Sequence, residues 1–308
     1  MTPPWAISAR SRPDGTAYPT DLYYRAQARR YELRPAAAGE DADAAVAGLS
    51  DAALSDPERL AGALLESGMA AIYTGRFMDA LDRGFDLQFR RGRYAIQVWR
   101  GWGAWLQTIA FCHLRDPEAA QRELQEVQRR FEADGRPGLL NDLRTSRLLL
   151  RRVEIATGAP ADEELIEEAR RAEASGRYRD DLDLILADLA IAVGALDDAQ
   201  ERLTRIERDP ASPIGAAMAE LGLAELAHLS ADADQAIERF AKLAQHCRER
   251  EATWLETQAL LGLHLCGDEQ AQQRFDHIRT TLPSAVAPDG SLASVAFGEP
   301  RVLWLLTV

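Results

Sequence analysis

Amphipathic stretches follow one another along most of the chain, and between them an alanine is repeatedly followed four residues later by leucine or phenylalanine. Within the stretches, apolar positions recur at helical spacing, and no convincing strand alternation precedes residue 284. The alanine-to-large pairs recur about every 35 to 40 residues, the period of stacked helix pairs. The clearest examples are Ala120/Leu124, Ala199/Leu203, Ala236/Phe240 and Ala271/Phe275.

Helix starts are marked by a capping side chain followed by proline near the first helical position, as in Ser55-Asp56-Pro57-Glu58 and Asp116-Pro117-Glu118. The first of these helices should stop near Gly75, and its partner should run to about Gly92. Pro283 closes the series. The remaining predicted helices cover about 94–114, 117–134, 139–157, 162–175, 180–194, 196–208, 213–229, 232–249, 252–265 and 268–281.

Three regions are predicted from the change in pattern along the chain. Residues 1–54 form an N-terminal arm and leading helices, 55–283 the helical repeat array, and 284–308 an apolar C-terminal tail. The tail is interpreted as a cap over the last helix pair, because terminal repeats need their exposed face covered. A docking peptide is the alternative.

The N-terminal arm, residues 1–35, is rich in arginine and aromatic residues. Thr20 or Asp21 is placed to cap a helix that runs to Arg34 and stops at Pro35. A second, acidic and alanine-rich helix is expected at about 40–54.

The spacing within the repeats resembles that of the tetratricopeptide-repeat family. The best match is residues 183–210, with Ala199, Leu203 and a closing Pro210, and residues 220–247 are similar. The resemblance implies an all-α fold: a right-handed superhelical solenoid of about five to six antiparallel helix pairs, plus N-terminal helices and a C-terminal capping tail. Small residues would let the helices of a pair approach, and large ones would fill the gap to the next pair.

In that family the first helix of each pair lines a concave groove that binds a protein or peptide. Carried over to this chain, the resemblance implies that the groove is aromatic early and more acidic late. The implied partner-binding positions are Met69, Tyr73, Trp102, Trp105, Ile109, Arg152, Asp188, Glu225 and His228.

The segment from Trp99 to Trp105 is the sharpest local feature, because Trp99, Trp102 and Trp105 recur every three residues and share roughly one helical stripe. One interpretation is an aromatic platform for a partner. The other is a large core contact between helices, against residues such as 20–34.

Composition further limits the classes of function that this chain can have. The 308 residues carry a net charge of −13, which repels nucleic acid backbones and favours partners with basic segments. Lys242 is the only lysine and Asn141 the only asparagine, so a P-loop is excluded, and the Lys/Asn set with which some family members grip a C-terminal carboxylate cannot form. Scarce lysine and asparagine beside abundant alanine and arginine are associated with GC-rich bacterial genomes.

No targeting or membrane signal is evident, because the start lacks a signal-peptide pattern and no apolar run reaches 18 residues. Three cysteines make no disulfide framework, so a cytoplasmic location is predicted. Neither Cys112-His113, His246-Cys247 nor the His264/Cys266 pair has spacing suited to a metal. We expect no metal, no cofactor and no enzyme activity.

These observations favour a non-catalytic adaptor or scaffold that binds another protein or a peptide segment in its groove. Two alternatives remain open. One is a regulatory subunit that senses a ligand or peptide and controls a partner enzyme. The other is a nucleic-acid contact through the basic N-terminal arm.

Overall fold

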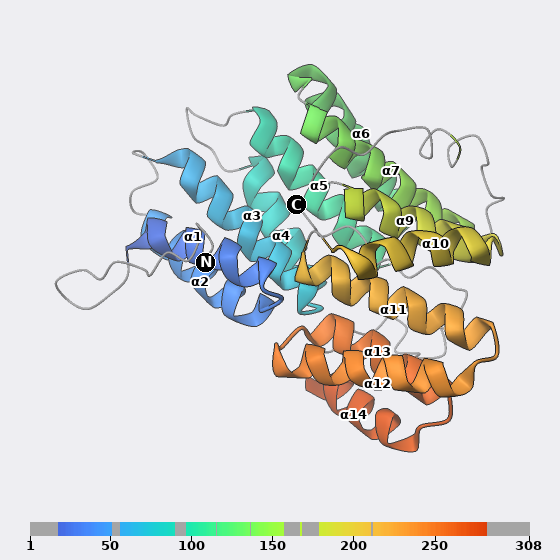
Figure 1. The fold of residues 1–308 in the computed structure, drawn as a ribbon. Helices are drawn as coiled ribbons and strands as arrows, with labels where there is room; N and C mark the ends of the chain where they lie inside the picture. The colour runs from blue at the N-terminus through green and yellow to red at the C-terminus, as the bar shows by residue number, and fades with distance from the viewer. Residues whose placement is uncertain are drawn as a thin grey trace.

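The computed structural model describes residues 18–50, 56–89, 97–114, 116–135, 137–156, 167, 179–210 and 212–281, and all regular structure within them is helical. Helices adjacent in sequence pack on one another, and they follow one another around the molecule (Figure 1). The helices with described bounds are α1 (Pro19–Tyr31), α2 (Pro35–Ser50), α3 (Pro57–Tyr73), α4 (Phe77–Phe89), α5 (Gln97–His113), α6 (Pro117–Asp134), α7 (Pro137–Ala156), α9 (Arg179–Ala192), α10 (Leu196–Arg208), α11 (Pro213–Leu229), α12 (Ala233–Glu249), α13 (Thr253–Leu265) and α14 (Glu269–Thr281).

The all-helical prediction is confirmed for the described residues, and most predicted helix limits lie within a few residues of the observed ones. Apart from residue 167, the helix expected at 162–175 lies outside the described residues, as does the tail 284–308. Helix α2 begins and ends earlier than the expected 40–54, because Pro35 starts this helix rather than only ending α1. The chain turns between the two helices at Leu33, which has a φ of 59°.

Local chemistry explains the helix starts. Asp56, Asp116 and Ser212 each accept a hydrogen bond from the backbone N–H three residues on, and each precedes a proline at the start of its helix. The cap satisfies a donor that has no partner within the helix, and proline has no N–H to leave unpaired.

The turn inside a helix pair has one recurring geometry. A residue of positive φ ends the first helix, as at Gly194 and Ala231, and the next N–H donates to the carbonyl five residues back. This closes the helix and reverses the chain. The same backbone bond joins Arg76 to Ala71, Asp116 to Phe111, Ala195 to Ala190, Asp232 to Ala227 and Asp268 to Leu263.

The alanine-to-large pairs that recur in the sequence form buried contacts between pairs. Ala199 and Ala236 are buried at the start of α10 and α12, where a small side chain lets helices approach. Leu203 faces Gly222 on α11, and Phe240 faces Gly262 on α13. The larger residue of each motif therefore fills the gap to the next pair, as the pattern predicts.

The first and last pairs of the array also touch. Helix α13 packs on α3, and the ring of Trp254 on α13 lies 5.1 Å from that of Phe77 on α4. Nearby, Arg250 Nη1 donates to the backbone carbonyl of Glu32, 218 residues away, over 2.8 Å. The stacking of the helices therefore brings the two ends of the array together. No local pattern in the sequence predicts this contact.

None of the described helices is long and apolar enough to cross a bilayer.

Candidate interaction site on the first helices

An aromatic cluster forms where the two ends of the array meet, and we call Phe77, His113 and Trp254 the aromatic trio. Phe77 begins α4, His113 ends α5, and Trp254 lies in the first turn of α13. The rings of Phe77 and His113 stack at 4.7 Å, and Trp254 stands edge-on to both, at 5.1 and 5.7 Å. Two consecutive helices, α4 and α5, thus meet a helix from a distant part of the chain, α13, in one cluster.

Burial sets the protonation of His113. Desolvation lowers the pKa of its imidazole to about 3, because the charged form would lose its hydration in this apolar cluster. The ring is therefore neutral at physiological pH, and its Nδ1 atom is buried. A neutral imidazole can donate or accept a hydrogen bond, according to its tautomer.

Three buried ring nitrogens have no hydrogen-bond partner within the described part of the chain: Nδ1 of His113, Nε1 of Trp254 and Nε1 of Trp105. Trp105 lies on α5 two turns before His113, and its side chain is buried. A buried polar group without a partner costs about 1–3 kcal/mol. These nitrogens are therefore places in the interior where a hydrogen bond to a bound molecule would stabilise the complex.

The positions that the family resemblance assigned to the groove are mostly enclosed. Trp102 and His228 are partly buried, and the side chain of Arg152 lies outside the described residues. The remaining six are each no more than 2% exposed: Met69, Tyr73, Trp105, Ile109, Asp188 and Glu225. In this conformation those six side chains have almost no surface to offer a partner, and their role in binding stays a prediction.

The tryptophan segment is divided among different neighbours. Trp102 lies edge-on to Trp105 at 5.2 Å and to Phe131 of α6 at 5.1 Å. Trp99 packs against a second apolar cluster, whose buried residues lie on α2, α3 and α4. Trp99 and Trp102 thus contact side chains of neighbouring helices, as the core-contact interpretation of this stripe expects.

The structure brings one cysteine and one histidine together that the sequence keeps 38 residues apart. The Cys266 Sγ and His228 Nδ1 atoms are 3.4 Å apart, at the ends of α13 and α11. Burial raises the pKa of the Cys266 thiol, which lowers the thiolate fraction and hence its nucleophilicity. The described residues contain no group of three or more side chains arranged to hold a metal ion.

The arginines of α1 are engaged in ion pairs within the protein. Arg25 and Arg29 both bind Asp41, with N···O distances of 2.5 and 2.8 Å. Arg30 binds Glu66 at 2.7 Å, and both side chains are buried. These arginines hold α1 against α2 and α3, so they are not free cations on an arm.

Trp254 and His113 were not among the residues singled out from the sequence. The first helix of the last unit, which carries Trp254, aligns ambiguously with the repeat pattern, and His113 was considered only as a metal ligand beside Cys112. Trp254 lies on the first helix of the last pair. Extending the repeat pattern to residue 254 would therefore have placed it among the candidate groove residues.

No family model, curated protein or solved structure matches this chain.

Proposed function

We propose that this protein is a non-catalytic adaptor that binds an extended segment of another protein along the first helices of its pairs. The repeated hairpins belong, in this proposal, to a right-handed tetratricopeptide-like solenoid of about five to six pairs. The sequential packing of neighbouring helices and the recurring turn geometry support it. Such arrays recognise partners through extended surfaces.

The observation that carries the proposal is the set of buried nitrogens on Trp105, His113 and Trp254 that have no partner among the described residues. An extended peptide presents a backbone carbonyl at every residue and would supply acceptors along α5 and α13 once these helices part to expose the buried nitrogens. Phe77 and Trp254 would pack against its apolar side chains, as aromatic anchors do in protein interfaces. The neutral His113 ring adds a hydrogen-bonding group without the cost of burying a charge.

The chemistry of the thiols supports binding rather than catalysis. Burial raises the pKa of Cys266 and raises that of Cys247 to about 12, so both stay protonated at physiological pH. An activated cysteine nucleophile shows the opposite shift. The ion pairs of Arg25, Arg29 and Arg30 likewise favour protein binding over nucleic-acid binding through the N-terminal arm.

The proposal is tested by selecting peptides on the purified protein from a random library and measuring their affinities by calorimetry. We expect Trp254→Phe and Trp105→Phe each to lower the affinity for the selected peptides about 5- to 10-fold, which corresponds to the loss of one hydrogen bond. Phenylalanine keeps an aromatic ring and removes the N–H. Trp102→Phe is the matched control and should change affinity less than twofold.

Failure to select any peptide, or equal affinity for the wild-type protein and both N–H deletion variants, would overturn the proposal. A variant without residues 1–17 separates the nucleic-acid alternative, because it keeps α1 and its ion pairs intact. Loss of a salt-sensitive nucleic-acid interaction in this variant would favour that alternative. We expect its peptide binding to be unchanged.

A further inference from the structure

Helix α4 carries a row of large apolar side chains that point away from the protein. Met78, Phe85 and Phe89 are 55%, 56% and 57% exposed, and the two phenylalanine rings lie 4.6 Å apart. Spacings of seven and four residues align the three on one stripe of the helix. We call these three residues the α4 stripe.

The comparable helices of other pairs lack such a row. Among the described residues, α6 and α10 carry no exposed large apolar side chain, and α12 carries only Ile237, at 38% exposure. Clustered exposed apolar residues on one helix are typical of interaction sites, whereas single ones need no explanation. The α4 stripe is therefore a feature of one helix rather than a general property of the array.

Acidic residues border the α4 stripe along one side. Asp79, Asp82 and Asp86 recur at three and four residues and so form a second row, within about 100° of the stripe around the helix axis. Asp82 and Asp86 form no ion pair within the described residues. The face of α4 thus combines an apolar row with an adjacent row of negative charge.

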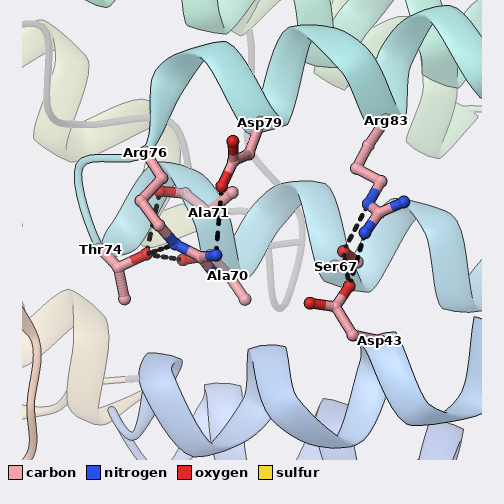
Figure 2. Close-up of polar contacts among 8 residues, drawn as sticks. All are labelled: Asp43, Ser67, Ala70, Ala71, Thr74, Arg76, Asp79 and Arg83. Carbon is pink, nitrogen blue, oxygen red and sulfur yellow. Dashed lines mark hydrogen bonds and ion pairs between the residues drawn. The ribbon is translucent and has the colours of Figure 1, made fainter. Parts of the chain in front are cut away.

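Arg76 and Arg83, beside and on α4, bind groups other than Asp82 and Asp86 (Figure 2). Arg83 donates from Nε to the Ser67 hydroxyl at 2.9 Å and from Nη2 to Asp43 at 2.9 Å, so it reaches across α3 to α2. Arg76 binds Thr74 and Asp79 at the α3–α4 turn. Neither neutralises the outer carboxylates of Asp82 and Asp86.

We propose that the outer face of α4 is a docking surface for a basic amphipathic helix of another protein. Apolar residues of that helix would cover the α4 stripe, and its lysine or arginine row would face Asp82 and Asp86. A second copy of this chain fits less well. A two-fold interface sets the same patch against itself, and would bring Asp82 and Asp86 against their own counterparts without a free cation on α4.

This surface is separate from the peptide site proposed on the first helices, since α4 uses its buried face to pack on α3 and α5. The protein would then bind two partner segments at once, an extended peptide at the interior site and a helix on the outer face of α4. Either proposal can fail without the other.

The test uses a stapled 18-residue helical peptide of leucine, lysine and alanine, with lysines along one edge of its leucine face. Its binding to the full-length protein is measured by fluorescence anisotropy at low and moderate salt. A second peptide, in which glutamate replaces lysine, is the charge control. We expect the lysine peptide to bind at least 10-fold more tightly, with affinity falling as salt increases.

Variants assign the binding to α4. We expect Phe85→Ser/Phe89→Ser to lose at least 10-fold in affinity, and Asp82→Asn/Asp86→Asn to lose about 5-fold along with most of the salt dependence. Matched variants on the outer face of α12, Ile237→Ser and Asp234→Asn/Glu238→Gln, remove one exposed apolar side chain and the same number of charges, and should bind as the wild type does. Trp254→Phe should also leave this binding unchanged.

Equal binding of the glutamate peptide, or full affinity in the folded Phe85→Ser/Phe89→Ser variant, would overturn the proposal. Analytical ultracentrifugation of the unliganded protein tests whether a second copy covers this face. Concentration-dependent dimers that disappear in Phe85→Ser/Phe89→Ser would show that a second copy covers this face, and would also overturn it.

Discussion

The C-terminal pairs, α9 to α14, and the N-terminal helices, α1 to α6, share one hairpin geometry but differ in how their helices contact. In the C-terminal pairs, an arginine directly precedes the large residue of each alanine-to-large motif. This arginine binds an acidic side chain on the preceding helix. The pairs are Arg202 with Asp183, Arg239 with Glu220, and Arg274 with Glu256. Each unit there is built in the same way.

The N-terminal helices depart from this arrangement at the same positions. Gly84 takes the place of Leu203 or Phe240, and α4 and α5 approach so closely that a Cβ added at Gly103 would lie 2.6 Å from the Gly84 carbonyl oxygen. Arg83, the counterpart of Arg239, reaches Ser67 and Asp43 instead of an acid on the first helix. The unusual contacts, the α4 stripe and two of the three ring nitrogens without a partner among the described residues fall in this half. We infer that the C-terminal pairs mainly provide a frame, and that the N-terminal helices, together with Trp254 of α13, carry the proposed binding surfaces.

The largest expected effect concerns the buried pair of Arg30 and Glu66. Arg30→Met should lower the free energy of unfolding by about 3–5 kcal/mol, because it leaves the Glu66 carboxylate buried without its cation. Urea unfolding followed by circular dichroism measures the change. The double variant Arg30→Met/Glu66→Leu should recover much of the loss. A loss below about 1 kcal/mol in the single variant would show that α1 is not held in this way.

Next come two glycines, one in each half. Gly103→Ala should cost about 2–3 kcal/mol, because its Cβ would press on backbone atoms that cannot move without separating α4 from α5. The Cβ added by Gly222→Ala meets only the end of the Leu203 side chain. This variant should change the free energy of unfolding by less than about 1 kcal/mol, because the gain in helix propensity offsets the crowding. Equal effects in thermal or urea unfolding would contradict the close approach of α4 and α5.

The pH dependence of stability reports on His113. Its folded pKa of about 3 lies below the ordinary value, so the unfolded state binds more protons between the two. The stabilisation is complete above about pH 6.5 and is lost as the pH falls towards 3. From pH 7 to pH 5 we expect the wild type to lose about 1–2 kcal/mol more than His113→Gln. Parallel curves for the two proteins would show that the ring is hydrated in the folded state.

The smallest effects are expected in the frame. Arg202→Gln, Arg239→Gln and Arg274→Gln each remove a partly exposed arginine from a carboxylate that keeps a second cation, and should each cost no more than about 1 kcal/mol. Because the three arginines occupy equivalent places, their costs should agree within about 0.5 kcal/mol. A loss above about 2 kcal/mol at one of them, measured by urea unfolding, would mean that the units are not equivalent.

Local chemistry explains why so many helix limits could be predicted from the sequence. Caps such as Asp56 and Asp116 act within three residues, and the apolar period of α10 needs no partner to be visible. The contact between Arg250 and Glu32 depends on how every intervening pair stacks, so no pattern near either residue reveals it. Spacing places Trp102 and Trp105 on one helix face but does not tell whether that face meets a partner or a neighbouring helix such as α6.

The contact between the two ends of the array is the feature on which the interior site depends, and a double-mutant cycle of Phe77→Leu and Trp254→Leu tests it most directly. The coupling is obtained from the unfolding free energies of the wild type, both single variants and the double variant. We expect about 1 kcal/mol of coupling, the value of an edge-to-face aromatic pair. Effects that add to within about 0.3 kcal/mol would show that the first and last pairs do not meet in solution.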